Sequence, residues 1–316
     1  MKDVTSWKPT ATIADLNSRS RFIQSIRQFF INQGYLEVDT PCLGEYGVTD
    51  CYLKNIEAVC NSETHYLQTS PEYYMKRLLA AGSGPIFQIG KVFRDEEKGR
   101  WHQPEFTMLE FYQLDIDHLQ LITVISELFQ TICGWPPIKL VTYQSLFEQN
   151  CGINPHLATL EELQICLKEF GLETVLPATE QDRDQYLFLL MADIIEPSLT
   201  EHDRPLAVID FPQSQAALAQ IQDGKAQRFE IYYRGLELAN GFHELTDITE
   251  QTKRFEQDNQ SRRQQQKEPS VIDPHFLAAL NYGLPACSGV AIGIDRLVAL
   301  YLGHQQIKTV ISFAKE

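Results

Sequence analysis

Two arginines, Arg94 and Arg100, flank an acidic run in the segment IFQIGKVFRDEEKGRWHQPEFTMLEFY, residues 86–112. A guanidinium matches a phosphate or a carboxylate with two parallel hydrogen bonds, so this loop has the residue types to grip a polyanionic substrate. The alternative is a solvated hairpin tip whose surface ion pairs contribute little. Taken alone, the residue types of the loop favour that simpler interpretation.

The residues on either side of the loop predict a long β-hairpin. Apolar runs at 86–93 and 106–112 have strand character and enclose a charged loop with one glycine. Because residues i and i+2 of a strand share a face, we expect Glu110 and Tyr112 to point together while Phe111 points away. Gly90 interrupts the first run, and a glycine inside a strand often marks the close approach of a ligand. The hairpin is therefore expected to line a pocket.

Three segments resemble the motifs of one enzyme family. FRDE followed by HQPEFTMLEFY resembles motif 2 of class II aminoacyl-tRNA synthetases, most closely the lysyl-tRNA synthetase branch. GLELANGFHELTD (235–247) is similar to the lysine-pocket strand of that branch, and SGVAIGIDRLVAL (288–300) is similar to motif 3. Three motifs in the right order are hard to obtain by chance. The resemblance implies an α+β catalytic fold with an antiparallel sheet flanked by helices.

The net charge of the chain argues against nucleic-acid partners. The 316-residue chain carries 42 acidic against 27 basic residues, a net charge of −15, whereas nucleic-acid binders usually present a basic face. A tRNA is therefore disfavoured as a partner. Because no apolar run of ~18 residues and no signal-peptide core occur, we expect no membrane span and a cytoplasmic location. The seven cysteines are expected to be free thiols, and no zinc-ligand spacing occurs.

The periodicity along the chain predicts one catalytic domain over residues 1–316 with a helical insertion at about 114–203. An amphipathic helix at 17–33, followed by an extended segment at 35–38, fits motif 1, which forms much of the dimer interface in the family. The alternative is an ordinary core helix and edge strand. The further expected elements are helices near 118–132, 159–170, 184–195, 246–267 and 274–281 and strands at 205–210 and 228–233.

Only about sixteen residues precede the motif 1 helix, so the anticodon-binding domain of lysyl-tRNA synthetases is expected to be missing. This layout resembles the elongation factor P β-lysine ligase family. The resemblance implies adenylation of (R)-β-lysine with ATP and Mg²⁺, and transfer of the lysyl group to a lysine side chain of elongation factor P. Elongation factor P is itself acidic. The net charge of −15 is therefore weaker evidence against a tRNA partner than it is without this resemblance.

The resemblance also implies roles in ATP binding. Arg94 would bridge the substrate carboxylate and the α-phosphate, and Arg296 of motif 3 would hold the γ-phosphate. Glu96 and Phe106 would bind the adenine by a hydrogen bond and by stacking. The remaining implied ATP contacts are Asp95, Gln103, Glu237, Leu238 and Gly293. A P-loop is absent, as expected for a family that holds ATP on an antiparallel sheet.

The lysine-pocket strand predicts a site for a cationic amino acid. Asn240, Phe242 and Glu244 alternate onto one strand face, so Glu244 is expected to reach the same pocket as Tyr112 and to bind a side-chain ammonium there. Glu237 resembles a metal-binding glutamate that works with Glu244 on Mg²⁺. Strict alternation puts these two glutamates on opposite faces, so the pairing requires a bulge or a twist near Gly241.

A second segment is expected to complete the amino-acid site together with Glu110. Ser70-Pro71-Glu72 resembles the family's segment that receives the other amino group, with Glu72 as its counter-charge. The same three residues also suit a helix start, as N-cap, first-turn proline and acidic first turn. We expect both roles at once.

Two residues depart from the family pattern. Gln103 stands where the ligase family usually carries asparagine, which puts its own contact to ATP in question. Ala291 stands where lysyl-tRNA synthetases carry glycine, and its methyl group could exclude α-lysine or favour a β-amino acid.

Two other functions remain open on the sequence. One is a minimal lysine-activating ligase with a tRNA or small-molecule acceptor, which differs only in what receives the amino acid. The other is a non-catalytic regulator. Such paralogues tend to lose the ATP-gripping residues, whereas Arg94, Glu96 and Arg296 are all present.

Overall fold

A computed structural model describes residues 7–315 of the chain. The chain forms two compact units, one from Met1–Asp115 with Thr246–Glu316 and one from Ile116–Leu245. No helix within the described range 7–315 is long and apolar enough to cross a membrane.

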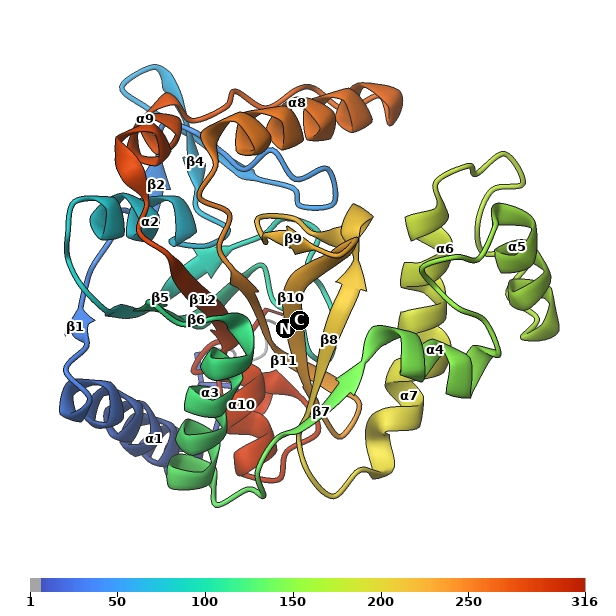
Figure 1. Ribbon diagram of the computed structural model, residues 1–316. Helices are drawn as coiled ribbons and strands as arrows, with labels where there is room; N and C mark the ends of the chain where they lie inside the picture. The colour runs from blue at the N-terminus through green and yellow to red at the C-terminus, as the bar shows by residue number, and fades with distance from the viewer. Residues whose placement is uncertain (1–6, 316) are drawn as a thin grey trace, which may run out of the picture. The chain divides into compact units, whose positions relative to one another are not determined.

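The first unit is built on the predicted hairpin. Strand β5 (Ile86–Phe93) pairs antiparallel with β6 (Glu105–Leu114), and β6 pairs antiparallel with β12 (Cys287–Gly293) (Figure 1). Strand β1 (Leu36–Glu37) adds to β5 in parallel. A small separate sheet has the order β2 (Leu43–Gly44), β4 (Glu63–Leu67), β3 (Ile56–Cys60). The antiparallel strands predicted for motifs 2 and 3 are thus confirmed.

The helices of the first unit are α1 (Ile13–Asn32), α2 (Glu72–Ala80), α8 (Ile248–Gln264), α9 (Pro274–Gly283), α10 (Ile294–Tyr301) and the 3₁₀ turn η4 (Ile307–Thr309). Helix α1 begins before the predicted residue 17 because the Thr12 side chain accepts a hydrogen bond from the Asp15 backbone and caps the helix. Its Phe30 ring stacks on Phe87 with centroids 4.9 Å apart and tilts against Phe111 at 4.7 Å. These contacts form a core on the face of the hairpin opposite to Glu110.

The second unit has strands in the order β11 (Leu236–His243), β10 (Lys225–Tyr233), β8 (Leu206–Pro212) and β7 (Lys139–Thr142), with β9 (Ile221–Gln222) on β10. Its helical elements are α3 (His118–Cys133), α4 (Tyr143–Cys151), α5 (Leu160–Glu169), α6 (Arg183–Leu190), the π-helix η1 (Met191–Ile195), α7 (Glu196–Ser198), η2 (Leu199–Glu201) and η3 (Gln213–Gln215). The helices predicted near 118–132, 159–170 and 184–195 are confirmed. Helix α4, capped by Thr142, was missed.

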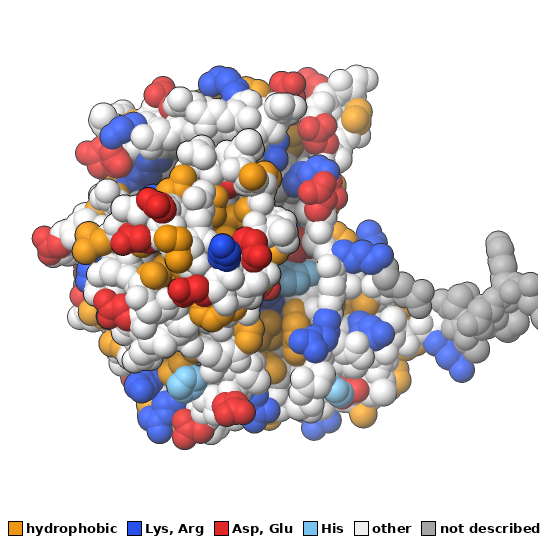
Figure 2. Space-filling model, turned by 90° about the vertical axis from the view of Figure 1, so that its right-hand side faces the viewer, with side chains coloured by type: hydrophobic (Ala, Val, Ile, Leu, Met, Phe, Trp, Pro, Cys, Tyr) orange, Lys and Arg blue, Asp and Glu red, His pale blue; other side chains and the backbone are white. Residues whose placement is uncertain are grey.

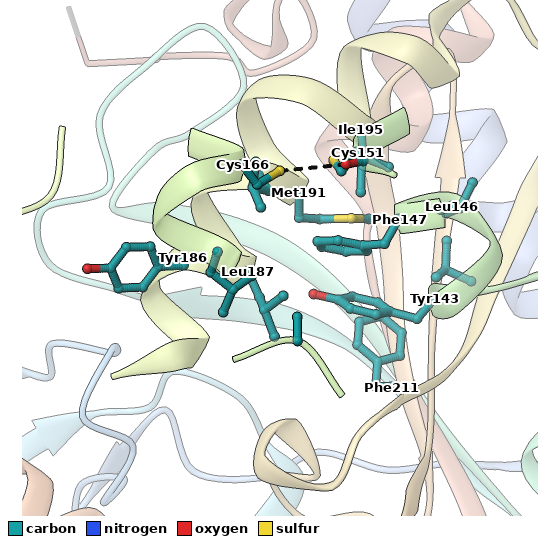
Figure 3. Packing of buried hydrophobic residues seen from close by; sticks show 14 of the residues in the cluster. Tyr143, Leu146, Phe147, Cys151, Cys166, Tyr186, Leu187, Met191, Ile195 and Phe211 are labelled. Atoms are coloured by element: carbon teal, nitrogen blue, oxygen red, sulfur yellow. Dashed lines mark hydrogen bonds between the residues drawn. The ribbon is translucent and has the colours of Figure 1, made fainter. Parts of the chain in front are cut away.

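The helical part of the second unit has its own core. The Tyr143 ring stacks on Phe147 with centroids 4.5 Å apart and tilts against Phe211 at 4.8 Å (Figure 3). Cys166 Sγ lies 3.7 Å from the carbonyl oxygen of Cys151, the contact that is dashed in Figure 3. All seven cysteines are free, which confirms the predicted thiols.

The surface carries the acidic excess without one dominant patch on the face that Figure 2 shows. Lys and Arg side chains lie among Asp and Glu side chains there, with apolar side chains between them. A mixed distribution of this kind keeps the local field weak even when the net charge is high.

Candidate active site

The side chain of Glu110 is the centre of a buried hydrogen-bond network on the hairpin. Tyr112 Oη donates to Glu110 Oε1 at 2.6 Å, and Ser70 Oγ donates to Glu110 Oε2 at 2.7 Å. The prediction that Glu110 and Tyr112 share a strand face is therefore confirmed. Ser70, from the segment before α2, is brought to the same carboxylate.

Burial disfavours the ionised form of the Glu110 carboxyl group. Only 2% of the residue is exposed, and this burial, reinforced by the charge of Glu72, raises the pKa of Glu110 to about 7. Hydrogen bonds from Tyr112 and Ser70 and the charge of Lys76 act in the opposite direction. A carboxyl group with a pKa near neutrality can change its charge when a cationic ligand arrives.

The start of α2 serves the helix and the site together. Ser70 Oγ accepts a hydrogen bond from the Glu72 backbone at 3.0 Å while it donates to Glu110. The predicted helix start is confirmed with one correction, because Pro71 and not Ser70 occupies the cap position, and the predicted contact of this segment to a substrate amino group stays a prediction. Helix α2 begins at Glu72, so Pro71 lies at the cap position and not inside the first turn.

A buried lysine that the sequence analysis missed neutralises Glu72. Lys76 Nζ donates to Glu72 Oε1 at 2.7 Å, and only 1% of Lys76 is exposed. The same ammonium lies 5.9 Å from the centroid of the Phe276 ring. The i, i+4 spacing of Glu72 and Lys76 on a helix was the available signal. A substrate amino group would have to share the Glu72 carboxylate with Lys76.

The strand next to Glu110 presents only small side chains on this face. In the β6–β12 register, Gly289 lies opposite Tyr112, Ala291 opposite Glu110 and Gly293 opposite Met108. Directly paired residues share a face, so the Ala291 methyl group is the largest side chain that β12 places beside the two polar groups. On the other side of β6, Gly90 lies opposite Met108. Strand β12 therefore places no bulky side chain beside Glu110 and Tyr112.

The two predicted arginines, Arg94 and Arg296, each contact residues of the hairpin near its tip. Arg296 Nη2 lies 2.6 Å from His102 Nε2, and Arg296 Nε donates to the Trp101 carbonyl at 3.2 Å. The Arg94 guanidinium carbon lies 5.2 Å from the centroid of the Phe106 ring. Because a guanidinium only donates, His102 Nε2 is the acceptor in the first contact.

His102 is the residue that both arginines influence. Burial lowers the pKa of His102, and the positive charges of Arg296 and Arg94 lower it further, against the carboxylate of Glu97. A neutral imidazole at His102 adds no further positive charge next to Arg296. The sequence analysis did not select His102, although it lies within the motif 2 segment.

The two acidic residues after Arg94 are paired with a lysine. Lys54 Nζ lies 2.9 Å from Asp95 Oδ2 and 2.7 Å from Glu96 Oε1, and Glu96 has a positive φ of 64°. Both carboxylates are exposed enough to leave this ion pair at small cost. Their contacts to ATP stay a prediction.

Gln103 holds the C-terminal segment. Its Nε2 donates to the Lys315 carbonyl at 3.1 Å, and its Oε1 accepts from the Lys315 backbone N–H at 2.9 Å. Thr10 Oγ1 holds the same segment by donating to the Ile311 carbonyl at 2.7 Å and accepting from the Ala314 backbone at 3.1 Å. The predicted contact of Gln103 to ATP would require its amide to leave Lys315.

This anchoring gives a direct prediction. Gln103→Asn shortens the side chain by one methylene, so at least one of the two bonds to Lys315 should be lost and carboxypeptidase should remove the last residues faster, as followed by intact mass. Thr10→Val should have a similar effect. Digestion of Gln103→Asn at the wild-type rate would show that the amide does not hold the segment.

In the second unit, strand β11 carries the predicted lysine-pocket residues and a bulge. The register with β10 shifts between Ile231, opposite Ala239, and Tyr232, opposite Glu237, so that Leu238 is the extra residue. The predicted irregularity exists, but it lies at Leu238 and not near Gly241. A bulge inverts the side-chain parity beyond it. Glu237 therefore shares a face with Asn240 and Phe242.

Glu237 lies in a charged cluster on that face. Burial would lower the pKa of Arg228, but the carboxylates of Glu230 and Glu237 outweigh it and raise that pKa. Arg228 pairs with Glu230 and donates through Nε to Asn240 Oδ1 at 3.3 Å. Glu244, just beyond β11, is 1% exposed, and its carbonyl accepts from Gln220 Nε2 at 3.0 Å. The predicted pocket shared by Glu244 and Tyr112 joins residues of both units and stays a prediction.

The residues present fit a magnesium ion only if substrate phosphates complete its ligands. Among residues 7–315, no group of three or more His, Cys, Asp or Glu side chains could hold a metal by itself. Mg²⁺ is commonly bound by one or two carboxylates together with substrate phosphates. Glu237 and Glu244 as the two carboxylates of such a site stay a prediction.

Comparison with known proteins assigns the chain to a family. The family described as tRNA synthetases class II (D, K and N) matches residues 6–316. A protein of Haemophilus influenzae (strain PittGG) named elongation factor P–(R)-beta-lysine ligase is 47% identical over 323 residues, with 99% of each chain covered. Relatives of the same name from Pasteurella multocida (46% identical, 100% of this chain and 99% of the relative) and Avibacterium paragallinarum (49%, 98% of each) agree. The chain therefore belongs to the class II tRNA synthetases (D, K and N) and, within them, to the family of the elongation factor P–(R)-beta-lysine ligases.

Proposed function

We propose that this protein is an ATP-dependent ligase that adenylates (R)-β-lysine and transfers the lysyl group to a lysine side chain of elongation factor P. Its relatives of that name match it over nearly their full length. The observation that carries the proposal is the polarity of strand β6. Two arginines lie near its start at the hairpin tip, and the buried carboxyl of Glu110 lies further along it. An amino acid with an anionic and a cationic end suits this arrangement.

The first chemical step joins two anions. A carboxylate oxygen of the amino acid attacks the α-phosphorus of ATP, the bond to the bridging oxygen breaks, and pyrophosphate leaves. Arg94 holds the carboxylate and the α-phosphate together, and Arg296 binds the γ-phosphate, so that charge on the transferring group is neutralised. Phe106 stacks on the adenine. The remaining ATP contacts that we propose are Asp95, Glu96, Gln103, Glu237, Leu238 and Gly293.

The second step transfers the acyl group. The uncharged amine of the acceptor lysine attacks the acyl carbon of the adenylate, and AMP leaves. Mg²⁺, held by Glu237 and Glu244, supplies further positive charge to the phosphates when it is bound. The two amino groups of the substrate are bound by Glu110, Tyr112 and Glu244 together with the segment Ser70, Pro71 and Glu72. The pocket is shaped by Asn240, Phe242 and Ala291. The whole chain, 1–316, acts as one catalytic domain with an insertion.

We also propose that the chain is a cytoplasmic homodimer that does not use tRNA. Ile31 at the end of α1 is 52% exposed and Leu36 in β1 is 53% exposed. Exposed large apolar side chains from neighbouring segments are typical of an association surface. Light scattering after gel filtration measures the mass directly.

The test of the function is pyrophosphate exchange with ATP, with (R)-β-lysine, (S)-β-lysine and α-lysine offered separately, followed by transfer to purified elongation factor P or to bulk tRNA. We expect exchange to be strongest with (R)-β-lysine and the label to move to the protein. Label on tRNA would replace this proposal by a minimal tRNA-charging ligase. Absence of exchange with every amino acid would leave a non-catalytic regulator.

Ala291 should determine which lysine isomer fits. Ala291→Gly removes a methyl group directly opposite Glu110, so we expect kcat/KM for α-lysine relative to (R)-β-lysine to rise roughly tenfold. Steady-state exchange kinetics with both isomers measure the ratio, and the KM for ATP should stay unchanged as an internal control. An unchanged isomer ratio would show that the methyl group plays no part in selection.

A further inference from the structure

Gln88 is a buried polar side chain that no role described so far uses. It lies in β5 directly opposite Glu110 of β6, so both side chains project from the same face of the hairpin. Only 6% of Gln88 is exposed. A residue at this position has the Glu110 carboxyl group as its nearest cross-strand neighbour.

The Gln88 side chain leans along the strand over Gly90. A Cβ atom at Gly90 would lie 3.1 Å from Gln88 Nε2 and 3.9 Å from the amide carbon of Gln88. Because Gly90 has no side chain, the Gln88 amide can lie over it on the same face of the hairpin as Glu110. This explains the glycine inside β5 without a direct contact between Gly90 and a substrate.

The amide oxygen of Gln88 lacks a partner within the described protein. Gln88 Oε1 is buried and accepts no hydrogen bond from any residue between 7 and 315. Thr69 directly precedes Ser70, and its Oγ1 atom is a second buried oxygen without a partner among these residues. Buried acceptors are normally satisfied, and an unsatisfied one in a polar pocket indicates a missing donor.

The charges around Gln88 identify the kind of donor. The carboxyl of Glu110 lies opposite, and the carboxylate of Glu72 adds to the negative potential at Glu110. An ammonium group would supply hydrogen-bond donors to Gln88 Oε1 and positive charge to Glu110 at once. A neutral donor would satisfy the amide but leave the Glu110 carboxylate buried without a counter-charge.

We propose that Gln88 is an additional substrate-binding residue whose amide oxygen accepts a hydrogen bond from the same ammonium group of the substrate that Glu110 neutralises. This inference rests on the proposed function, because it requires an amino-acid substrate with a free ammonium group. Both amino groups of a β-lysine have this chemistry. The experiment distinguishes them.

The experiment measures equilibrium binding by calorimetry, so that it does not depend on turnover. The ligands are (R)-β-lysine, 6-aminohexanoate, which lacks the amino group near the carboxylate, and 3-aminohexanoate, which lacks the distal one. The variants are Gln88→Met, which keeps the length of the side chain without the acceptor, and Gln88→Glu, which keeps an acceptor oxygen. Gln113→Met is the matched control, because Gln113 is a glutamine of β6 whose side chain projects from the opposite face.

We expect Gln88→Met to weaken binding of (R)-β-lysine roughly 10- to 100-fold, as for a lost hydrogen bond to a charged group, while Gln113→Met binds like the wild type. Gln88→Glu should bind at least as well as Gln88→Met for every cationic ligand. The analogue whose affinity does not change in Gln88→Met lacks the amino group that Gln88 contacts. Equal affinities of the wild type and Gln88→Met for all three ligands would overturn the proposal.

Failure of the proposed function gives a different result. If the wild type binds none of the three ligands, the amino-acid substrate is wrong and the role of Gln88 falls with it. If the wild type binds (R)-β-lysine but Gln88→Met binds it equally well, only the role of Gln88 is wrong. A circular-dichroism melting curve for each variant separates lost binding from lost folding.

Discussion

Arg94→Ala should lower kcat/KM for pyrophosphate exchange by at least about 10³-fold, the loss typical of a group that stabilises charge in the transition state. Arg94 lies against Phe106 and acts on His102 together with Arg296, so its guanidinium belongs to the cationic end of the site. Steady-state exchange with ATP and (R)-β-lysine measures the effect. The melting temperature should change little, because Arg94 is only half-buried and is not part of the apolar core.

Two variants control this experiment. Arg100→Ala removes an arginine from the same loop, one whose guanidinium carbon lies 5.7 Å from the centroid of Trp101, and should leave exchange within about threefold of the wild type. Arg94→Lys keeps the charge but loses the planar fork, so its activity should lie between those of Arg94→Ala and the wild type. Equal losses in Arg94→Ala and Arg100→Ala would contradict a specific role for Arg94.

Glu110→Gln should make the protein more stable at pH 8 and much less active. The pKa of Glu110 is raised from its ordinary value of 4.5 to about 7 in the folded protein, chiefly by burial, so the folded state binds a proton that the unfolded state releases. Between these values the stability of the wild type falls as the pH rises, by about 3 kcal/mol in total as an upper estimate. The amide cannot ionise and avoids this loss.

Melting of the wild type and Glu110→Gln at pH 5 and pH 8 measures that difference. We expect the advantage of the variant to be large at pH 8 and small at pH 5. Activity should move the other way, with kcat/KM for (R)-β-lysine reduced roughly 10²-fold because a buried counter-charge to an ammonium is lost. A variant that is less stable than the wild type at both pH values would contradict the raised pKa.

The same pKa predicts a pH dependence of substrate binding in the wild type. An ammonium group favours the ionised form of Glu110, so KM for (R)-β-lysine should rise as the pH falls below about 7. Glu110→Gln should show a flat profile over this range. The KM for ATP in the wild type serves as the control.

The sequence predicted the local part of the site well, because strand parity and helix capping depend on neighbouring residues. The shared face of Glu110 and Tyr112 and the hydrogen bond between Ser70 and the Glu72 backbone follow from spacings of two residues each. Lys76, His102 and Lys54 were not predicted to matter. Lys76 pairs with Glu72 within one helix, so its spacing was a local signal that was overlooked. The partners of His102 and Lys54 are fixed by tertiary contacts, as in the approach of Arg296 to His102 across the chain.

The bulge in β11 and the setting of Gln103 show the same limit. Alternation required an irregularity between Glu237 and Glu244, but its place at Leu238 depends on the register with β10, which one strand cannot determine. The amide of Gln103 meets the backbone of Lys315, 212 positions further along the chain. A resemblance between motifs carries no information about such a contact.

The order of the strands in the first unit has a consequence for how the chain is made. Strand β6 is synthesised next to β5, but its other partner, β12, is encoded near the C-terminal end, after the whole of the second unit. At usual elongation rates the apolar edge of β6 waits roughly 10 to 40 s on the ribosome for its neighbour. An unpaired edge of this kind can pair with other chains. Nascent chains that stop before Cys287 should therefore be the most dependent on chaperones.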